Sequence, residues 1–360
     1  MIGAKGFDAT ENQHWRAANK NREGNVMKIS NLLGAAGIAA LLCAGAARAE
    51  ETTVRIQDYA GNGNMLYRIA QSKGYCAKRG IKCQLQMVAS GPLGMQALLA
   101  KSIDVAFVPP EVAINASLKG AVVKTIVSGA QRNVFLIVAR NDLKIPDGDK
   151  DFKAMMAALK GKKIGVPARG SGAELQFALM AVKAGLNPND YTYVAVGMTN
   201  TSHGALMSQQ IDASMTYEPS ASMCNVLKSC TTVYRGAFAT EPKEIGGTNG
   251  ASADMFVTQE MIEKSPKVID GLIAAAKEAE AFIQNPANFP EALKIAKTYF
   301  EFKMPKGDEV MEVSLKGAIP SYKAGVSRAA LKQIAANMLE MKQIPAAFDT
   351  SKIVYDKAPQ

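Results

Sequence analysis

Two acidic residues follow apolar segments that resemble one another. Glu218 belongs to ALMSQQIDASMTYEP, residues 205–219, and Glu111 ends ALLAKSIDVAFVPPE, residues 97–111. Each segment passes from a helix end through Ile-Asp into an apolar strand and stops at proline or aromatic residues. A carboxylate at such a strand end can accept hydrogen bonds from an amine or from several hydroxyl groups of a ligand. Tyr217 adds a phenol beside Glu218, and the alternative for Glu218 is an ion pair with a lysine at the rim.

The turn Gly170-Ser171-Gly172 offers a different chemistry. It follows an apolar strand and opens a helix, so free backbone N–H groups and a serine hydroxyl form a ready anion site there. The spacing of Gly165 and Gly170 resembles a phosphate loop, but the lysine of a nucleotide-binding loop is missing, which argues against an NTPase. The alternative is that Ser171 only caps its helix. We expect a polar ligand with its acidic end at Ser171 and a donor end toward Glu218.

Four further polar residues complete the set of candidate ligand contacts. They lie in loops after predicted strands or before a predicted helix: Tyr59, Asn62, Ser90 and Thr199. Asp104 and Asp212 occupy the opposite ends of their strands. We therefore interpret these two aspartates as structural turn residues on the far edge of each sheet.

The sequence contains few residues that could form a catalytic site. His203 is the only histidine beyond the N-terminal segment, and no Ser/His/Asp or Cys/His set with a recognisable spacing is visible. We therefore expect no catalytic residue, no metal site and no cofactor.

Residues 27–49 have the composition of a signal peptide. Met27-Lys28 precedes the apolar run 32–46, and Ala47-Arg48-Ala49 follows it. This order of charged, apolar and small residues predicts cleavage before Glu50 and export. The apolar run is shorter than a membrane-spanning helix requires.

The rest of the N-terminus and the overall charge narrow the classes of function. Residues 1–26 are polar and unpatterned, and we interpret them as an upstream start-codon assignment or an added tail. Cys43 raises the alternative of a lipoprotein, which the bulky residues before it disfavour. Residues 1–49 carry six Lys or Arg and three acids, so their removal lowers the formal net charge from +10 to +7. The remaining basic residues are scattered, which argues against nucleic-acid binding.

Four of the five cysteines lie beyond the predicted signal peptide: Cys76, Cys83, Cys224 and Cys230. An even count in an oxidising compartment favours disulfides, although three pairings are formally open. We choose the local pairs 76–83 and 224–230. A zinc site is the alternative, but the C-x6-C and C-x5-C spacings are poor for ligands and only one histidine is available.

The elements that must position these residues alternate between strand and helix in two similar halves. The first half contains strands at 53–57, 83–87 and 103–108, and the second has strands at 163–166, 191–196 and 212–216. Helices between them predict two small parallel sheets with right-handed crossovers. The two Ile-Asp strands are then the last core strands of twin domains, and their carboxyl ends face one another across a cleft, where ligands of open α/β sheets bind.

Strands at 133–139 and 254–257 connect these halves to the rest of the chain. From residue 258 onward the pattern is nearly all helical. The economical arrangement inserts the second half into the first and leaves two crossing segments as a hinge.

A resemblance to a known family rests on three segments: ALKGKKIGVPARGSGAELQFALMAVKAGLNPND at 158–190, IDASMTYEP at 211–219 and ADMFVTQEMIEKSPKVID at 253–270. They resemble periplasmic solute-binding proteins of the nitrate/sulfonate/taurine type, which feed ABC importers and share a fold with the thiamine-pyrimidine synthases. The resemblance runs from about Val54 to Ala346. Glu111 departs from it, because many relatives have a small or apolar residue there. The Cys-rich, His-containing motif of the synthases is absent.

The resemblance implies an α/β protein with the two-lobed periplasmic binding protein fold of type II. Two parallel or mixed sheets flanked by helices would be joined by a hinge with two crossing segments. We predict residues 50–138 and 251–360 as lobe I and residues 139–250 as lobe II. The expected function is a periplasmic, monomeric receptor that is not an enzyme and delivers a small polar anion to the transmembrane subunits of an ABC permease.

Two other functions stay open, together with the identity of the ligand. One is an enzyme on the same fold, of the pyrimidine-synthase kind, and the other is a ligand-sensing protein without transport. Taurine, alkanesulfonates, nitrate, pyrimidines and other small organic acids are all compatible with the sequence.

Overall fold

A computed structural model describes residues 51–360, which belong to one compact unit. The predictions for the tail at 1–26, for the signal peptide at 27–49 and for Cys43 lie outside the described residues. Within 51–360, none of the helices combines the length and the apolar character that a bilayer span needs.

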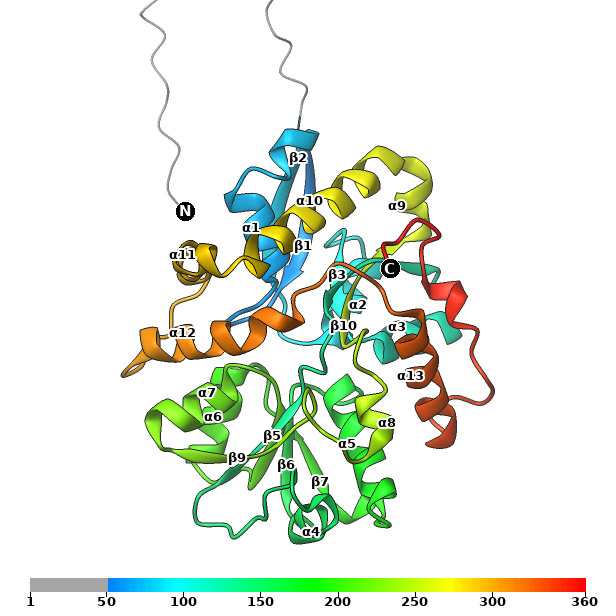
Figure 1. Cartoon of the computed structure of the whole chain (residues 1–360). Helices are drawn as coiled ribbons and strands as arrows, with labels where there is room; N and C mark the ends of the chain where they lie inside the picture. The colour runs from blue at the N-terminus through cyan, green and yellow to red at the C-terminus, as the bar shows by residue number, and fades with distance from the viewer. Residues whose placement is uncertain (1–50) are drawn as a thin grey trace, which may run out of the picture. The chain divides into compact units, whose positions relative to one another are not determined.

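The strands fall into three sheets (Figure 1). They are β1 (Thr52–Asp58), β2 (Ile81–Met87), β3 (Ala106–Val108), β4 (Val123–Ala130), β5 (Leu136–Arg140), β6 (Lys163–Val166), β7 (Thr192–Ala195), β8 (Ala213–Thr216), β9 (Cys230–Arg235) and β10 (Ala253–Thr258).

The α-helices lie between the strands and make up most of the last third of the chain. They are α1 (Met65–Ser72), α2 (Gly91–Leu99), α3 (Pro110–Leu118), α4 (Phe152–Ala158), α5 (Gly172–Lys183), α6 (Thr199–Met207), α7 (Ser220–Leu227), α8 (Lys243–Gly246), α9 (Gln259–Lys264), α10 (Pro266–Gln284), α11 (Phe289–Tyr299), α12 (Gly307–Ala318) and α13 (Arg328–Glu340).

Lobe I contains the two smaller sheets. β1 and β2 pair in parallel, and a parallel bridge between Ile56 and Val105 connects β1 to the start of β3. β10 lies between β3 and β4 and is antiparallel to both. The strand expected at 254–257 is therefore confirmed as β10, and it returns the chain from lobe II to lobe I. α10 lies along α1 and also contacts β4 (Figure 1).

Lobe II contains the five-stranded sheet, with the order β7-β6-β8-β5-β9. β6 pairs in parallel with β7 and with β8, as the alternation of strands and helices predicted. β5 is antiparallel to β8 and β9. Leu136 and Val138 pack with one apolar cluster, whereas Ile137 and Ala139 pack with another. The run NVFLIVA is apolar on both sides because helices cover both faces of the sheet.

The two Ile-Asp segments are built alike. Asp104 accepts hydrogen bonds from the backbone N–H of Arg55 at 2.8 Å and from its Nε at 2.9 Å. In lobe II, Asp212 accepts one from the backbone N–H of Lys163 at 2.9 Å and one from Arg140 Nη1 at 3.2 Å. Each aspartate therefore ties the start of its strand to a neighbouring parallel strand. This confirms the structural role expected for both.

Two crossing segments connect the lobes. The first leads from β4 to β5 and the second leads into β10. They are hydrogen-bonded to each other, because the backbone N–H of Asn133 donates to Asn249 Oδ1 at 2.7 Å and that of Val134 donates to Ser252 Oγ at 2.9 Å. The predicted lobe boundaries at residues 138/139 and 250/251 stay a prediction.

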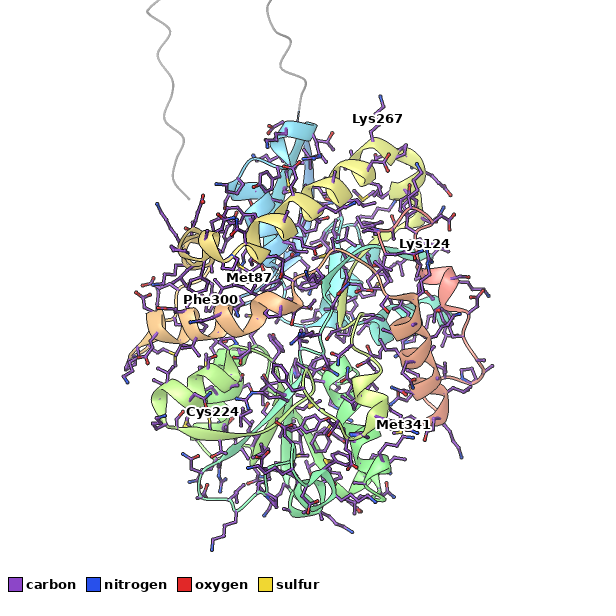
Figure 2. The ribbon with its side chains drawn as sticks, viewed as in Figure 1. Met87, Lys124, Cys224, Lys267, Phe300 and Met341 are labelled. Atoms are coloured by element: carbon purple, nitrogen blue, oxygen red, sulfur yellow. A yellow bond between two sulfur atoms is a disulfide. The ribbon has the colours of Figure 1, made fainter. Side chains whose placement is uncertain are left out.

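Two disulfides brace the lobes, and the predicted pairing is confirmed. Cys76 is bonded to Cys83 in lobe I with a Cα–Cα distance of 6.0 Å. Cys224 on α7, labelled in Figure 2, is bonded to Cys230 at the start of β9 with a Cα–Cα distance of 4.5 Å. The second bridge therefore fixes α7 against the edge strand of the five-stranded sheet.

Candidate functional site

A cavity of about 340 Å³ lies between the lobes at the carboxyl ends of the parallel strands. Its wall combines aromatic rings with a few polar groups, as small-molecule sites commonly do. The aromatic residues are Tyr59, Phe107, Phe135, Tyr217, Phe238 and Tyr322. The polar and charged residues are Asn62, Ser90, Arg132, Asn133, Ser171, Glu218, Ser222, Asn225, Arg235 and Ser321.

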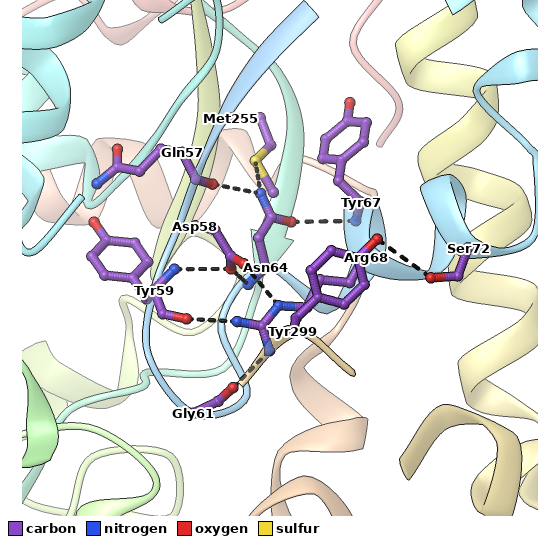
Figure 3. Close-up of polar contacts among 10 residues, drawn as sticks. All are labelled: Gln57, Asp58, Tyr59, Gly61, Asn64, Tyr67, Arg68, Ser72, Met255 and Tyr299. Carbon is purple, nitrogen blue, oxygen red and sulfur yellow. Dashed lines mark hydrogen bonds and ion pairs between the residues drawn. The ribbon is translucent and has the colours of Figure 1, made fainter. Parts of the chain in front are cut away.

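The loop after β1 carries Tyr59 and Asn62 to this cavity, and a buried ion pair holds the loop in place (Figure 3). Arg68 Nε donates to Asp58 Oδ2 at 2.9 Å, and both side chains are at most 2% exposed. The same guanidinium donates to the carbonyl oxygens of Gly61 at 2.6 Å and Tyr59 at 2.7 Å. Asp58 in turn accepts from the backbone N–H of Asn64 at 2.6 Å. A side chain at Gly63 would overlap this network, since an added Cβ would lie 2.2 Å from Arg68 Nη2.

Asn62 and Tyr59 present their side chains with different hydrogen-bonding states. Tyr59 Oη donates to the carbonyl oxygen of Phe107 at 2.8 Å, so the hydrogen-bond donor of its hydroxyl is already used. Asn62 Nδ2 donates to Ser314 Oγ at 2.7 Å, whereas Asn62 Oδ1 is buried with no hydrogen-bond partner among the described residues. Asn62 therefore offers an unused acceptor at the cavity wall.

Tyr217 and Glu218 reach the cavity directly after β8, as their position in the repeat predicted. Ser222 donates to Glu218 Oε2 through its backbone N–H at 3.1 Å and its hydroxyl at 2.9 Å. Burial raises the pKa of Glu218, while the bonds from Ser222 and the charge of Arg235 lower it in part. No lysine pairs with Glu218 within residues 51–360, and its Oε1 makes no hydrogen bond there. Oε1 is thus available to a ligand.

Arg132 and Arg235 are cavity residues that the sequence analysis missed. Arg132 lies in the first crossing segment and Arg235 ends β9. Neither guanidinium has a carboxylate within 4.0 Å in the described part of the chain. The guanidinium carbon of Arg132 instead lies 5.8 Å from the ring centre of Phe238. The crossing segments were predicted as the hinge, and a hinge borders the cleft, which is the signal that would have pointed to Arg132.

The N-terminus of α5 is capped by its own residues, and Ser171 and Gly172 line the cavity. Ser171 caps the helix by accepting from the backbone N–H of Glu174 at 3.5 Å, and Glu174 Oε2 accepts from the backbone N–H of Gly170 at 2.7 Å. Ser171 therefore caps its helix, as the alternative for this residue stated, and Arg169 pairs with the Glu174 carboxylate at 2.9 Å. The carboxylate of Glu174 therefore adds a negative charge beside the helix N-terminus, where it competes with a ligand anion for the helix dipole.

Gly172 has a packing role in addition. An added Cβ would lie 2.8 Å from Pro109 Cβ and 3.3 Å from Phe135. Because Pro109 follows β3 in lobe I, this glycine lets the two lobes come together. On the other side of the cavity, an added Cβ at Gly61 would lie 2.6 Å from Pro219 Cδ, so a second glycine–proline contact joins the lobes there.

Three of the predicted ligand residues do not line the cavity: Glu111, Gly170 and Thr199. Thr199 is fully buried at the start of α6. Glu111 lies in the first turn of α3 and accepts from Gln176 Nε2 at 3.3 Å, while Gln176 Oε1 accepts from Asn133 Nδ2 at 2.8 Å. Burial raises the pKa of Glu111 to about 7. Glu111 is therefore two hydrogen bonds away from the cavity, through Asn133 of the hinge.

Asp254 is a second buried carboxyl group near this network. It lies on β10 opposite Ser128 of β4, and both of its oxygens lack a hydrogen-bond partner among the described residues. Burial raises the pKa of Asp254 to about 7. The nearby hydroxyl of Ser128, which makes no hydrogen bond, lowers the pKa of Asp254 in part. The negative charge of Glu111 raises it further.

The geometry suits binding. His203 donates or accepts a hydrogen bond with Ser229 Oγ at 3.0 Å and does not line the cavity. Glu218 is the cavity's acidic residue, and its partner Ser222 is a helix-start residue. The site can hold a small molecule through aromatic contacts, two guanidinium groups and one carboxylate.

Two lobes joined by two crossing segments around such a cavity define the periplasmic binding protein fold. The chain belongs to the family described as NMT1/THI5 like, which matches residues 64–288. A protein of Brucella abortus (strain 2308) that is named as a binding protein is 26% identical over 286 residues, covering 76% of this chain and 82% of the relative. A binding protein of Brucella suis biovar 1 matches with the same identity and coverage.

Solved structures share the fold. The alkanesulfonate-binding protein SsuA of Xanthomonas axonopodis pv. citri, bound to MOPS, has a TM-score of 0.68 and 17% identity, with 85% of this chain and 99% of that chain covered. The nitrate-binding protein NrtA of Synechocystis PCC 6803 has a TM-score of 0.66 and 16% identity, with 85% and 86% covered. These structural relatives are solute-binding proteins.

Proposed function

We propose that this protein is a periplasmic receptor that binds a small organic monoanion and delivers it to an ABC importer. The observation that carries the proposal is the charge of the cavity wall. Its charged residues are Arg132, Arg235 and Glu218. With Glu218 ionised their sum is one positive charge, which a single anionic group on the ligand would balance. Guanidinium groups bind planar and forked anions well because they donate several parallel hydrogen bonds.

The arginines are a better anion site than Ser171. The carboxylate of Glu174 puts a negative charge beside the N-terminus of α5, whereas Arg132 and Arg235 have no carboxylate partner among residues 51–360. We therefore move the expected position of the anionic group from Ser171 to the arginines. Glu218 Oε1 is free to accept a hydrogen bond from a donor on the ligand.

Membership of the NMT1/THI5-like family and the likeness to sulfonate- and nitrate-binding proteins support the receptor role. The MOPS bound to one of these relatives carries a sulfonate on a larger body, which agrees with an organic anion. In this role the partners are the ligand and the transmembrane subunits of a permease, and the protein is a monomer. Cysteines paired as two disulfides agree with an oxidising compartment such as the periplasm.

Two alternatives give different results. An enzyme on this fold would convert its ligand, whereas a receptor returns it unchanged after denaturation. A sensor would bind the same anions, but importer genes would be missing beside its own gene. The absence of a histidine from the cavity wall, within the described residues, favours binding over general acid–base chemistry.

Calorimetry with ethanesulfonate, propionate and nitrate tests the proposal. Arg235→Ala removes hydrogen bonds to a charged group, worth about 1.5–3 kcal/mol, so organic anions should bind on the order of 10- to 100-fold more weakly. Lys267→Ala is the matched control, because it removes one positive charge from an exposed position on α10, far from the cavity wall (Figure 2). The proposal is wrong if no anion binds, or if both variants bind like the wild type.

A further inference from the structure

The cavity is larger than a simple anion needs. At about 30 Å³ for each water molecule in the liquid, its volume of about 340 Å³ corresponds to roughly eleven waters. It falls at the lower end of the range of about 300–1,000 Å³ that is typical of ligand pockets. Nitrate or a short alkanesulfonate at the arginines would leave most of this space to water. A ligand that fills it has a substantial body beyond its anionic group.

The wall around that body is aromatic and comes from both lobes. The ring of Tyr59 in lobe I lies 5.8 Å from that of Phe107, with an interplanar angle of 65°. It also lies 6.0 Å from the ring of Tyr217 in lobe II, at 71°. Edge-to-face pairs of this kind leave ring faces that the partner ring does not cover. Aromatic side chains favour offset-stacked or edge-to-face contact with another ring.

Phe238 links the aromatic wall to the anion site. This side chain is 64% exposed, although it is large and apolar and lines the cavity. The guanidinium of Arg132 lies 5.8 Å from its ring centre. A ligand whose anionic group meets Arg132 and whose body covers Phe238 would remove this ring from water and leave the arginine paired.

Unused polar atoms in the same wall point to a ligand as well. Asn62 is 3% exposed, and its Oδ1 has no partner in the described part of the protein. Tyr217 Oη is likewise buried without a partner there. Buried polar atoms in folded proteins are nearly always hydrogen-bonded, so polar substituents on the ligand body would complete these two groups.

We propose that the ligand is a monoanion built on a planar aromatic ring, an arylsulfonate or an arylcarboxylate. Its ring lies among Tyr59, Tyr217 and Phe238, and its anionic group lies at Arg132 and Arg235. This inference rests on the proposed function, because it concerns the ligand of the same cavity.

Matched pairs of anions test the ring without changing the head group. Calorimetry compares benzenesulfonate with ethanesulfonate, and benzoate with propionate. The ring adds four carbon atoms to be buried, so each aromatic member should bind on the order of 100-fold more tightly than its partner. Cyclohexanesulfonate has the same number of carbons without the planar ring and should bind more weakly than benzenesulfonate.

A substitution in the cavity wall tests whether Phe238 contacts the aromatic ring of the ligand. Phe238→Ala changes an exposed side chain, so the fold should persist. It should reduce the ratio of benzenesulfonate to ethanesulfonate affinity severalfold. Leu99→Ala is the control, because Leu99 is 46% exposed and lies outside the cavity wall. If the ratio of benzenesulfonate to ethanesulfonate affinity is the same in wild type and Phe238→Ala, Phe238 does not contact the ring and this placement of the ligand is wrong.

The outcomes separate the two proposals. If short-chain anions bind but aromatic ones bind no more tightly, the ring is wrong and the anion receptor stands. If cyclohexanesulfonate binds as tightly as benzenesulfonate, the site selects for apolar volume, and the proposal of a planar aromatic ring is wrong. If none of the anions binds, the proposed function itself fails.

Discussion

Replacement of Asp254 by asparagine should change how the stability of the protein depends on pH. The carboxyl group is fully buried on β10 and makes no hydrogen bond within the described residues. Burial raises its pKa from 3.8 to about 7, so the folded protein holds this proton at pH values where the unfolded chain has released it. The contribution of Asp254 to stability is therefore complete below pH 4 and is lost as the pH rises through about 7.

The size of the loss follows from the shift. A difference of about three pKa units at 1.36 kcal/mol each gives on the order of 4 kcal/mol between pH 4 and pH 8. More than half of this falls between pH 5 and pH 8. Asparagine has no proton to lose, so the variant should gain this amount relative to the wild type as the pH rises. The buried amide of asparagine changes the free energy of unfolding by the same amount at every pH. Only the pH dependence of the difference between variant and wild type therefore reports on the carboxyl group.

Urea unfolding followed by circular dichroism at pH 5, 6, 7 and 8 measures this difference. Asp104→Asn is a control of opposite sign. Burial pushes the pKa of Asp104 up, but the hydrogen bonds and charge of Arg55 outweigh it and lower the pKa. That carboxylate stabilises the fold above its unfolded pKa, so its loss should destabilise the protein at pH 8. Parallel stability curves for wild type and Asp254→Asn from pH 5 to pH 8 would refute the reasoning.

Two further predictions concern the scaffold of the site. Arg68→Met leaves the carboxylate of Asp58 buried and unpaired, so the free energy of unfolding should fall by about 3–5 kcal/mol in urea titrations, and a loss below about 1 kcal/mol would contradict the role of this pair. Replacing either pair of disulfide cysteines by serine should cost about 2.5 kcal/mol for so short a loop. Only the 224–230 pair should also weaken ligand binding in calorimetry, because it braces α7, which holds Glu218; equal binding in both variants would argue against that link.

Features that depend on neighbours in the chain could be predicted from the sequence. The Ser171 cap of α5 and the two disulfides each arise within a few residues of the chain, so their spacing alone was informative. The parallel strands of lobe II were predictable because each alternates with a helix. The placement of Tyr217 and Glu218 followed from the end of such a strand.

The rest depends on contacts between distant segments. Arg235 reaches the cavity because β9 pairs with β5, about a hundred residues earlier in the chain, and the sequence analysis did not predict β9 at all. Glu111 was expected at a strand end, but Pro110 begins α3 and places Glu111 inside its first turn. Proline at a helix start was read only as the end of a strand. Thr199 was expected before a helix, but α6 begins at Thr199 itself and buries this side chain.

The glycine–proline contact between Gly61 and Pro219 makes the gap between the lobes a quantity that can be adjusted. Gly61 has a φ of 72° and leaves 2.6 Å between an added Cβ and Pro219 Cδ, and it lies outside the cavity wall. A side chain there acts as a wedge that lowers the fraction of molecules in the arrangement described here, and apparent affinity falls in proportion to that fraction. An engineered biosensor could thus have its working range set at one position that the ligand never touches.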